Sequence, residues 1–255
     1  MKRQSEKEVY KMDGNVVDSS GNNAGNLKRI NKYISETGYC SRREADKLVE
    51  SGVVTINGEL AAIGTKVSPS DVVTVKGEVV GGKKKPVYIA FHKPVNVTST
   101  TDLKDPTNII DYIGYPDRIF PIGRLDKSSE GLIFLTNDGD IVNKILRSGN
   151  NHEKEYIVTV NHPVTEEFLT DMAAGVDIGV EPGDIVTQPC TVKQVNRDVF
   201  NIVLTQGINR QIRRMCDALN YQVYRLIRVR IMNVQLKGIE SGKWRYLDKD
   251  EIAEI

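Results

Sequence analysis

The stretch Gly-Gly-Lys-Lys-Lys at residues 81–85 does most to constrain how this chain can fold. Two glycines loosen the backbone and three successive lysines repel one another, so the composition is that of a linker. A chain of 255 residues has room for two domains that each bury a core. We therefore interpret the chain as two folding units, residues 27–80 and residues 87–255, joined by a linker at 81–86.

The first 26 residues mix lysine, glutamate, glycine, asparagine and serine with almost no apolar side chains. Such a segment cannot bury enough apolar surface to offset the entropy lost on ordering. We expect residues 1–26 to form a disordered lead.

The unit at 27–80 has the pattern of two helices followed by short strands. Apolar residues from Leu27 to Ile34 recur at helical spacing, and Gly38 is placed to end that helix. Ser41 and Glu44 have the spacing of a capping box at the start of a second helix. The alternating segment VVTINGEL then contains an Asn-Gly turn, which is typical of a hairpin, and the strand VVTVKG follows.

In the unit at 87–255, segments with strand patterns outnumber those with helical patterns. Because several neighbouring strands are close enough in sequence for hairpins, the pattern predicts an α+β fold with a mixed, mostly antiparallel sheet. We expect strands at 87–94, 118–125, 132–138, 154–160, 199–206 and 224–236, and helices at 140–148, 165–174 and 208–219.

The net charge of +1 hides a strongly basic segment. Between Gln206 and Arg230 there are six arginines and a single acid, Asp217. Such a segment can contact phosphate although the whole chain is nearly neutral.

Three widely spaced cysteines and three histidines form no metal-ligand motif and no disulfide framework. No apolar run approaches the ~18 residues of a membrane helix, and the N-terminus lacks the apolar core of a signal peptide. We therefore expect a cytoplasmic protein without a metal and without a membrane partner.

The stretch GRLDKSSEG places Asp126 between Arg124 and Lys127, just before the apolar run LIFLT. On this pattern alone two interpretations stay open, a charged turn before a strand or a catalytic carboxylate in an electropositive pocket. Asp126 and Glu130 could also be the carboxylate pair of a glycosidase. Gly131 and the strand pattern after it argue against the helix that would bring those two carboxylates onto one face.

The segment from RINKYI through SRREA to VTINGE and DVV resembles the S-four-type RNA-binding module, first described in a ribosomal small-subunit protein. Basic side chains on two adjacent helices could follow an RNA backbone. The alternative is a solvated helix surface balanced by neighbouring acids. The residues expected to bind RNA are Lys28, Arg29, Lys32, Arg42, Arg43 and Lys47.

Four stretches of the second unit, HKPVNVTST, GRLDKSSEGLIFLTNDGD, HEKEY and QGINRQIRRM, occur in an order that resembles the bacterial ribosomal-RNA pseudouridine synthases of the RsuA family. HEKEYIVTV, GINRQIRRMC and RIMNV are most similar to the branch that acts on large-subunit (23S) ribosomal RNA. The resemblance implies isomerisation of a uridine in ribosomal RNA, with transfer RNA as an additional candidate substrate. It also implies a monomer that needs no cofactor.

The resemblance assigns roles to individual residues. Asp126 falls on the catalytic aspartate, which acts on the ribose as nucleophile or as base. Tyr156 matches the tyrosine that packs against the target base, and Arg213 matches the arginine that pairs with the aspartate. We expect the substrate pocket to include Arg124, Leu125, Asn209, Arg210, Ile212 and Leu226, and Arg214 to contact RNA.

One position departs from the family pattern, because Asn96 stands where relatives commonly have glycine. Asparagine tolerates a left-handed backbone better than most residues do, so we expect the turn to survive. A non-catalytic RNA-binding or ribosome-assembly protein on the same fold is the other candidate function that the sequence leaves open.

Overall fold

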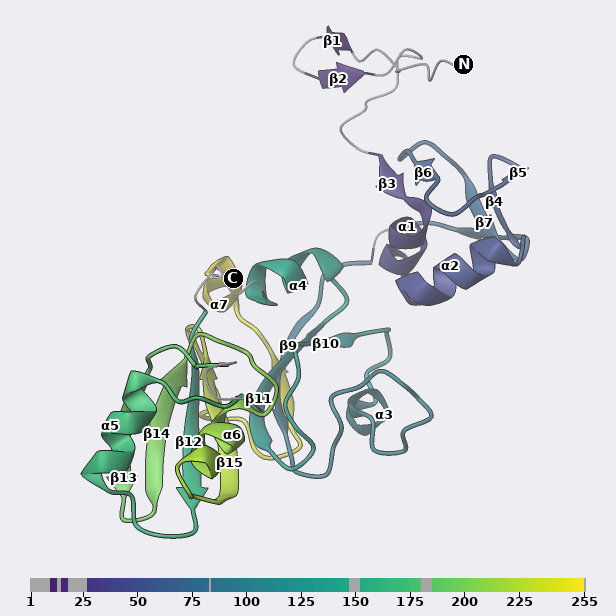
Figure 1. Cartoon of the computed structure of the whole chain (residues 1–255). Helices are drawn as coiled ribbons and strands as arrows, with labels where there is room; N and C mark the ends of the chain where they lie inside the picture. The colour runs from purple at the N-terminus through teal and green to yellow at the C-terminus, as the bar shows by residue number, and fades with distance from the viewer. Residues whose placement is uncertain are drawn as a thin grey trace. The chain divides into compact units, whose positions relative to one another are not determined.

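The computed structural model describes residues 10–12, 15–17, 27–82, 84–146, 152–179 and 185–254. The chain divides into two compact units, Met1–Lys85 and Pro86–Ile255 (Figure 1). Most of the expected disordered lead at 1–26 lies outside the described residues. Within it, strands β1 (Tyr10–Met12) and β2 (Asn15–Val17) pair antiparallel.

The first unit contains the two predicted helices, α1 (Ile30–Glu36) and α2 (Arg42–Glu50). The predicted capping box is present, since Glu44 N donates to Ser41 Oγ at 3.2 Å and Ser41 N donates to Glu44 Oε2 at 2.8 Å. The first helix begins three residues later than its apolar pattern does, at Ile30, because the preceding strand β3 (Lys28–Arg29) pairs with β6 (Lys66–Val67).

A four-stranded antiparallel sheet completes this unit, in the order β5 (Glu59–Leu60), β4 (Val54–Ile56), β7 (Val73–Val75), β8 (Glu78–Val80). The Asn-Gly hairpin is confirmed, with φ of 53° at Asn57 and 88° at Gly58. Ile30, Ile34, Ala45 and Val49 from the helices pack against the buried valines of the strands.

The second unit is built on one mixed sheet, and the fold is α+β as predicted. Its strands run in the order β13 (Thr191–Asn196), β14 (Val199–Leu204), β12 (Lys154–Val160), β15 (Val223–Ile231), β11 (Glu130–Thr136), β9 (Tyr88–Lys93), β17 (Trp244–Tyr246). The β11–β15 pairing is parallel and the other pairings of the described strands are antiparallel.

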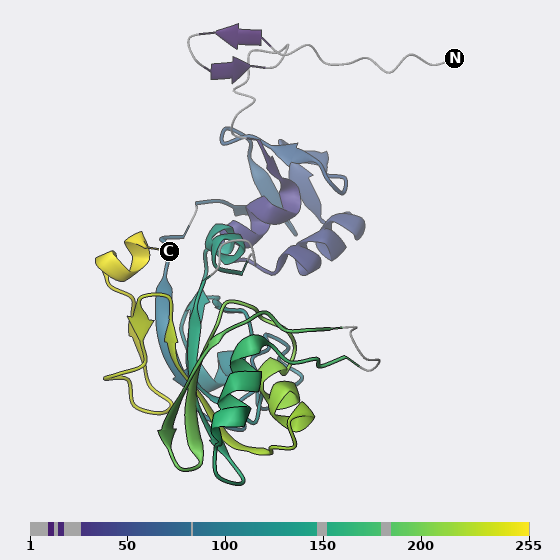
Figure 2. The same cartoon turned by 60° about the vertical axis from the view of Figure 1, so that its left-hand side comes forward.

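Two helices, α5 (Glu166–Ala174) and α6 (Gln211–Ala218), cover one face of the β13–β14–β12–β15 part of this sheet (Figures 1 and 2). Phe168 and Met172 of α5 and Ile212 and Met215 of α6 share one apolar core with the inward residues of these strands. The alternating burial of β12 and β14 is the pattern expected of strands with one covered face.

At the other end of the sheet, β9 and β11 are buried on both faces. Ala90 and Phe134 belong to a core that includes α4 (Gly139–Leu146). Phe91 and Ile133 belong to a separate core that includes α3 (Ile109–Ile113). Burial on both faces explains why LIFLT is a continuous apolar run without alternation.

The sequence interpretation of this unit was wrong at two points. The expected strand at 224–236 is two strands, because Met232 adopts φ of 53° and the chain turns back as β16 (Val234–Gln235), which pairs with β15. The expected helix at 208–219 begins at Gln211, after a left-handed Arg210. The pattern did not reveal α3, β13, β17 or α7 (Lys249–Ala253), which are short or lack alternation.

Candidate active site

Asp126 lies in the loop that joins β10 (Phe120–Ile122) to β11, two strands that pair antiparallel. The loop closes as a turn in which Ser129 N donates to Asp126 O at 3.0 Å. The Asp126 side chain is 33% exposed, so its carboxylate is accessible although the loop is held. The charged turn that the sequence offered is therefore present, and it leaves the carboxylate accessible, while the catalytic role of Asp126 stays a prediction.

A second loop, residues 94–99, fixes the backbone on both sides of Asp126. Asn96 N donates to Lys127 O at 2.8 Å. Ser99 Oγ donates to Leu125 O at 2.8 Å and accepts from Leu125 N at 3.2 Å. Asn96 adopts φ of 68°, so the asparagine takes up the left-handed conformation that was expected at this turn.

Lys93 is fully buried beneath this second loop. Its Nζ donates to Pro94 O and to Val97 O, both at 2.8 Å. The pKa of Lys93 is lowered to about 8, mainly by burial and also by the charge of Arg228, while the charges of Asp126 and Glu130 act in the opposite direction. A buried ammonium within electrostatic range of Asp126 therefore anchors the loop that holds Asp126.

Gly131 brings the start of β11 into direct backbone contact with β15. A Cβ atom at this position would lie 2.3 Å from Arg228 O and 2.5 Å from Arg228 N, and the glycine has φ of 115°. A side chain is therefore excluded where the Asp126 loop enters the sheet. Glu130 pairs with Arg225, Nε to Oε1 at 2.5 Å. Glu130 is thus engaged elsewhere, which weakens the glycosidase interpretation.

A cavity of about 460 Å³ opens beside Asp126. It lies where the core under α5 and α6 meets the core under α4, since Leu226 belongs to the first and Phe134 to the second. Tyr156 is buried in its wall, 9% exposed. All nine residues expected to be catalytic or to form the pocket line this cavity: Asp126, Tyr156, Arg213, Arg124, Leu125, Asn209, Arg210, Ile212 and Leu226.

The arginine that pairs with Asp126 in the structure is Arg210, with Nη1 3.9 Å from Oδ2. Arg213 instead donates from Nη2 to Ser128 O and to Ser129 Oγ, both at 3.1 Å, and from Nη1 to Val223 O at 3.2 Å. The expected direct pair between Arg213 and Asp126 is therefore replaced by hydrogen bonds to the two residues that follow Lys127. The reason is that the first turn of α6 faces the backbone of the loop.

The guanidinium group of Arg213 nevertheless interacts electrostatically with Asp126. Burial lowers the pKa of Arg213 and the nearby Arg210 lowers it further, whereas Asp126 raises it. The carboxylate of Asp126 therefore interacts electrostatically with two guanidinium groups, those of Arg210 and Arg213.

The residues expected to bind RNA differ in their contacts. Arg214 does not line the cavity and donates to Ile178 O. Lys28 and Lys32 pair with Glu36, with N–O distances of 2.5 and 3.6 Å. The remaining four basic residues are exposed on the first unit: Arg29, Arg42, Arg43 and Lys47.

Two cationic residues of the cavity were missed by the sequence interpretation, Lys154 and Arg228. Arg228 is 5% exposed, and its Nε donates to Leu132 O at 2.6 Å. Burial lowers the pKa of Lys154, and Arg228 lowers it further. Lys154 could have been inferred, because it precedes Tyr156 by two residues on the same strand and so shares its face.

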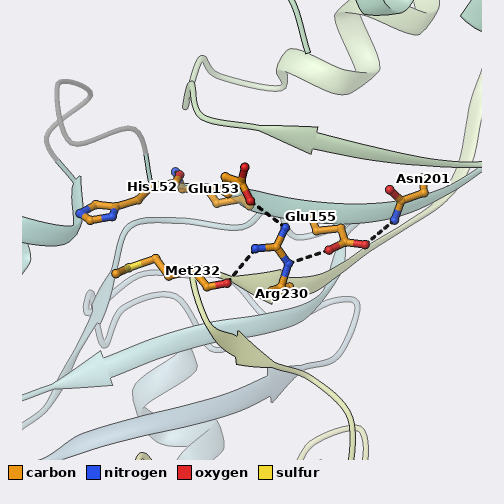
Figure 3. Close-up of polar contacts among 7 residues, drawn as sticks. His152, Glu153, Glu155, Asn201, Arg230 and Met232 are labelled. Carbon is orange, nitrogen blue, oxygen red and sulfur yellow. Dashed lines mark hydrogen bonds and ion pairs between the residues drawn. The ribbon is translucent and has the colours of Figure 1, made fainter. Parts of the chain in front are cut away.

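The position of Arg228 could not have been inferred in that way. Along the β12–β15 pair, Glu155 is opposite Arg230 but Tyr156 is opposite Arg228, so Val229 is an extra residue in β15. This bulge turns Arg228 toward the cavity and Arg230 toward the other face of the sheet, where Glu155 lies. Figure 3 shows Arg230 on that face among Glu153, Glu155 and the Met232 carbonyl.

In the part of the chain that the structure describes, no group of three or more His, Cys, Asp and Glu side chains is arranged to hold a metal ion. None of its helices has the length and apolar character needed to cross a lipid bilayer.

Comparisons with known proteins show the family to which the chain belongs. A family model for RNA pseudouridylate synthase matches residues 87–218, and a model for the S4 domain matches residues 28–73. The chain is 54% identical over 229 residues to the dual-specificity RNA pseudouridine synthase RluF of Escherichia coli (strain K12), covering 89% of this chain and 78% of that protein.

A second relative, ribosomal large subunit pseudouridine synthase B of Bacillus subtilis (strain 168), is 33% identical over 238 residues, covering 90% of this chain and 96% of that protein. A solved crystal structure of a pseudouridylate synthase superimposes with a TM-score of 0.65 at 29% identity, covering 88% and 98% of the two chains. The chain therefore belongs to the RNA pseudouridylate synthase family and is an isomerase of uridine in RNA, with an S4 domain in its first unit. The resemblance seen in the sequence is confirmed.

Proposed function

We propose that the protein converts a uridine of bacterial large-subunit ribosomal RNA to pseudouridine in the cytoplasm, with Asp126 as the essential carboxylate. The named targets of the relatives support the choice of ribosomal RNA, and the dual specificity of RluF makes a second RNA, such as a transfer RNA, part of the proposal. The unit at 27–80 recruits RNA, the unit at 87–255 carries the chemistry, and a monomer is sufficient for both.

The observation that carries the proposal is an accessible carboxylate whose backbone is fixed on both sides, at the edge of a cavity with an aromatic wall. In the reaction the bond from ribose C1′ to uracil N1 breaks and a bond from C1′ to uracil C5 forms. C5 loses a proton and N1 gains one. Attack on the ribose and removal of a ribose proton both need an ionised carboxylate, and the guanidinium group of Arg210 lies 3.9 Å from Oδ2 of Asp126.

We assign the binding of the target uridine to Tyr156 and the basic residues. A uridine within folded RNA has to leave its stack before Asp126 can reach it, which costs a few kcal/mol. Stacking on an aromatic ring offsets this cost, since it contributes roughly 1–3 kcal/mol of binding free energy per base. In this proposal Tyr156 holds the extruded base together with Ile212 and Leu226, which line the same cavity.

The proposal is tested with Asp126→Asn, which keeps the size of the side chain and removes its charge. We expect wild type to form pseudouridine in protein-free bacterial large-subunit ribosomal RNA, measured by mass spectrometry of nucleosides, and Asp126→Asn to form none. Asp198→Asn, at an exposed turn between β13 and β14, serves as the matched control and should be fully active.

Equal product from Asp126→Asn and wild type would refute the catalytic role of Asp126. Release of free uracil, with loss of mass from the RNA, would favour the glycosidase interpretation. Retention of RNA without product by wild type, on both ribosomal and transfer RNA, would favour the non-catalytic interpretation of this site.

A further inference from the structure

Arg210 is held loosely by Asp126. The separation of 3.9 Å between Nη1 and Oδ2 is longer than the 2.7–2.9 Å typical of a charge-assisted hydrogen bond, and the Arg210 side chain is 51% exposed. Among the described residues, no hydrogen bond joins its guanidinium to another side chain or carbonyl. Most donors of Arg210 are therefore available to a ligand that enters the cavity.

The backbone of Arg210 is also unusual. It is the N-cap residue of α6, with φ of 52° and ψ of 30°, and its side chain caps no backbone N–H. Short side chains such as Asn and Asp suit both a left-handed backbone and an N-cap, whereas arginine suits neither. A residue that disagrees with its local structure in this way points to a function for the side chain.

Arg213, three residues later, behaves differently. It makes three hydrogen bonds to Ser128, Ser129 and Val223, so its guanidinium is fixed to the Asp126 loop and to β15. Arg213, in the first turn of α6, is thus fixed, whereas Arg210, at the N-cap, has only its long contact with Asp126. Because Arg213 already supports the loop, Arg210 is left for a separate role.

The chemistry of a nucleotide suggests a role for Arg210. Under the proposed function, on which this inference rests, Asp126 contacts the ribose of the target uridine. The phosphates on either side of a ribose lie within the reach of a guanidinium group that touches the same carboxylate. A phosphate and an ionised carboxylate repel each other, so a cation between them lowers the free energy of bringing them together.

We propose that Arg210 is the phosphate ligand of the target nucleotide: it pairs with Asp126 in the free protein and moves to a phosphate beside the target uridine when RNA binds. Arg213 remains on the loop in both states. Arg210 is thus a positioning residue for the substrate, and it lets an anionic backbone approach an anionic catalytic group.

The test uses Arg210→Asn, Arg210→Lys and the control Arg197→Asn, which removes the same charge from an exposed turn outside the cavity. The probe is the shortest fragment of bacterial large-subunit ribosomal RNA that wild type retains in a binding assay. We expect Arg210→Asn to reduce the slope of log Kd against log salt concentration by about one, as for the loss of one phosphate contact. Arg210→Lys and Arg197→Asn should keep the wild-type slope.

Kinetics separate this role from an effect on Asp126. In Arg210→Asn we expect KM for the RNA to rise about tenfold or more, with kcat at saturating RNA within about threefold of wild type. Because asparagine suits the left-handed backbone, the thermal unfolding midpoint of Arg210→Asn should equal or exceed that of wild type. If the midpoint of Arg210→Asn is lower, the salt slopes of the variant and wild type are compared at a temperature at which both proteins are folded.

An unchanged salt slope for Arg210→Asn, with a fall in kcat instead of a rise in KM, would overturn the inference, because Arg210 would then serve Asp126 alone. Binding is measured separately from product, so this outcome differs from failure of the proposed function. The protein Asp126→Asn should bind the fragment at least as tightly as wild type, since Arg210 no longer has to leave a carboxylate. Weaker binding by Asp126→Asn would also count against the exchange.

Discussion

Two arginines of β15, Arg228 and Arg230, are separated by one residue and have opposite surroundings. Arg230 donates to Glu155 at 2.7 Å, to Met232 O at 2.8 Å and to Glu153 at 3.0 Å (Figure 3). Hydrogen bonding to Glu155 raises the pKa of Arg230. Arg228 lies in the cavity wall, where its Nη2 is buried without a hydrogen-bond partner among the described residues.

The difference follows from one extra residue in a strand. Without the bulge at Val229, side chains two apart in β15 would point to the same face. With it, Arg230 completes a network of ion pairs on the face away from the cavity, the outer face, and Arg228 joins Lys154 in the cavity wall. Burial and the charge of Arg228 lower the pKa of Lys154 and also that of Lys93, which is buried beneath the 94–99 loop. We interpret the satisfied face as structural and the face with excess positive charge as the one that receives RNA.

The sharpest way to break this comparison is to replace each arginine by methionine. Arg230→Met leaves the carboxylates of Glu153 and Glu155 without their cation, and we expect the free energy of unfolding to fall by about 2–3 kcal/mol. Arg228→Met removes a buried guanidinium group whose Nη2 has no hydrogen-bond partner among the described residues. We therefore expect the free energy of unfolding to change by less than about 1 kcal/mol. Both values are measured by urea unfolding.

Activity should respond in the reverse order. Below its unfolding midpoint, Arg230→Met should keep the wild-type kcat, whereas Arg228→Met should lose about tenfold in kcat/KM. The reason is that uracil carries negative charge while its bond to the ribose is broken, and a cation in the wall stabilises that charge. Equal losses of stability and of activity in the two variants would show that the two faces do not differ in role.

A smaller effect concerns the pH dependence of stability at Lys93, whose ammonium interacts electrostatically with Arg228. Lys93 has a folded pKa of about 8 against an ordinary value of 10.5, so the unfolded chain binds more protons between these two pH values. The contribution of Lys93 to the free energy of unfolding therefore rises with pH through this window, and below about pH 8 the folded state bears the full cost of burying the charge.

We expect wild type to gain on the order of 1–2 kcal/mol relative to Lys93→Met between about pH 7.5 and about pH 9.5, measured by urea unfolding at each pH. Lys104→Met, at an exposed position, should follow the wild-type curve. If the difference between wild type and Lys93→Met stayed constant over this window, the ammonium of Lys93 would not be the group that titrates.

The smallest expected effect is on the outer face. Asn201 Nδ2 donates to Glu155 Oε1 at 2.7 Å, so Asn201→Ala removes one hydrogen bond from the Arg230 network (Figure 3). We expect a loss of about 1 kcal/mol in the free energy of unfolding and no change in pseudouridine formation. Asn196→Ala, at an exposed position of β13, is the matched control. A loss of activity in Asn201→Ala would contradict a purely structural outer face.

The sequence by itself determined the local features of this protein. The capping box at Ser41, the hairpin turn at Asn57 and the left-handed Asn96 follow from short-range chemistry, which a few neighbouring residues decide. The α+β class followed from the alternation of apolar residues. The placement of Asp126 in a loop between strands followed from the apolar run behind it.

The tertiary structure alone decided which side chains meet. Arg213 bonds to Ser128, 85 residues away in sequence, and Arg210 takes the place beside Asp126 that the sequence interpretation gave to Arg213. Arg228 enters the cavity because a bulge reverses one face of a strand. Periodicity fixes where a side chain points on its own element, but sheet order, register and bulges depend on the packing of the whole unit, and no spacing within one segment contains them.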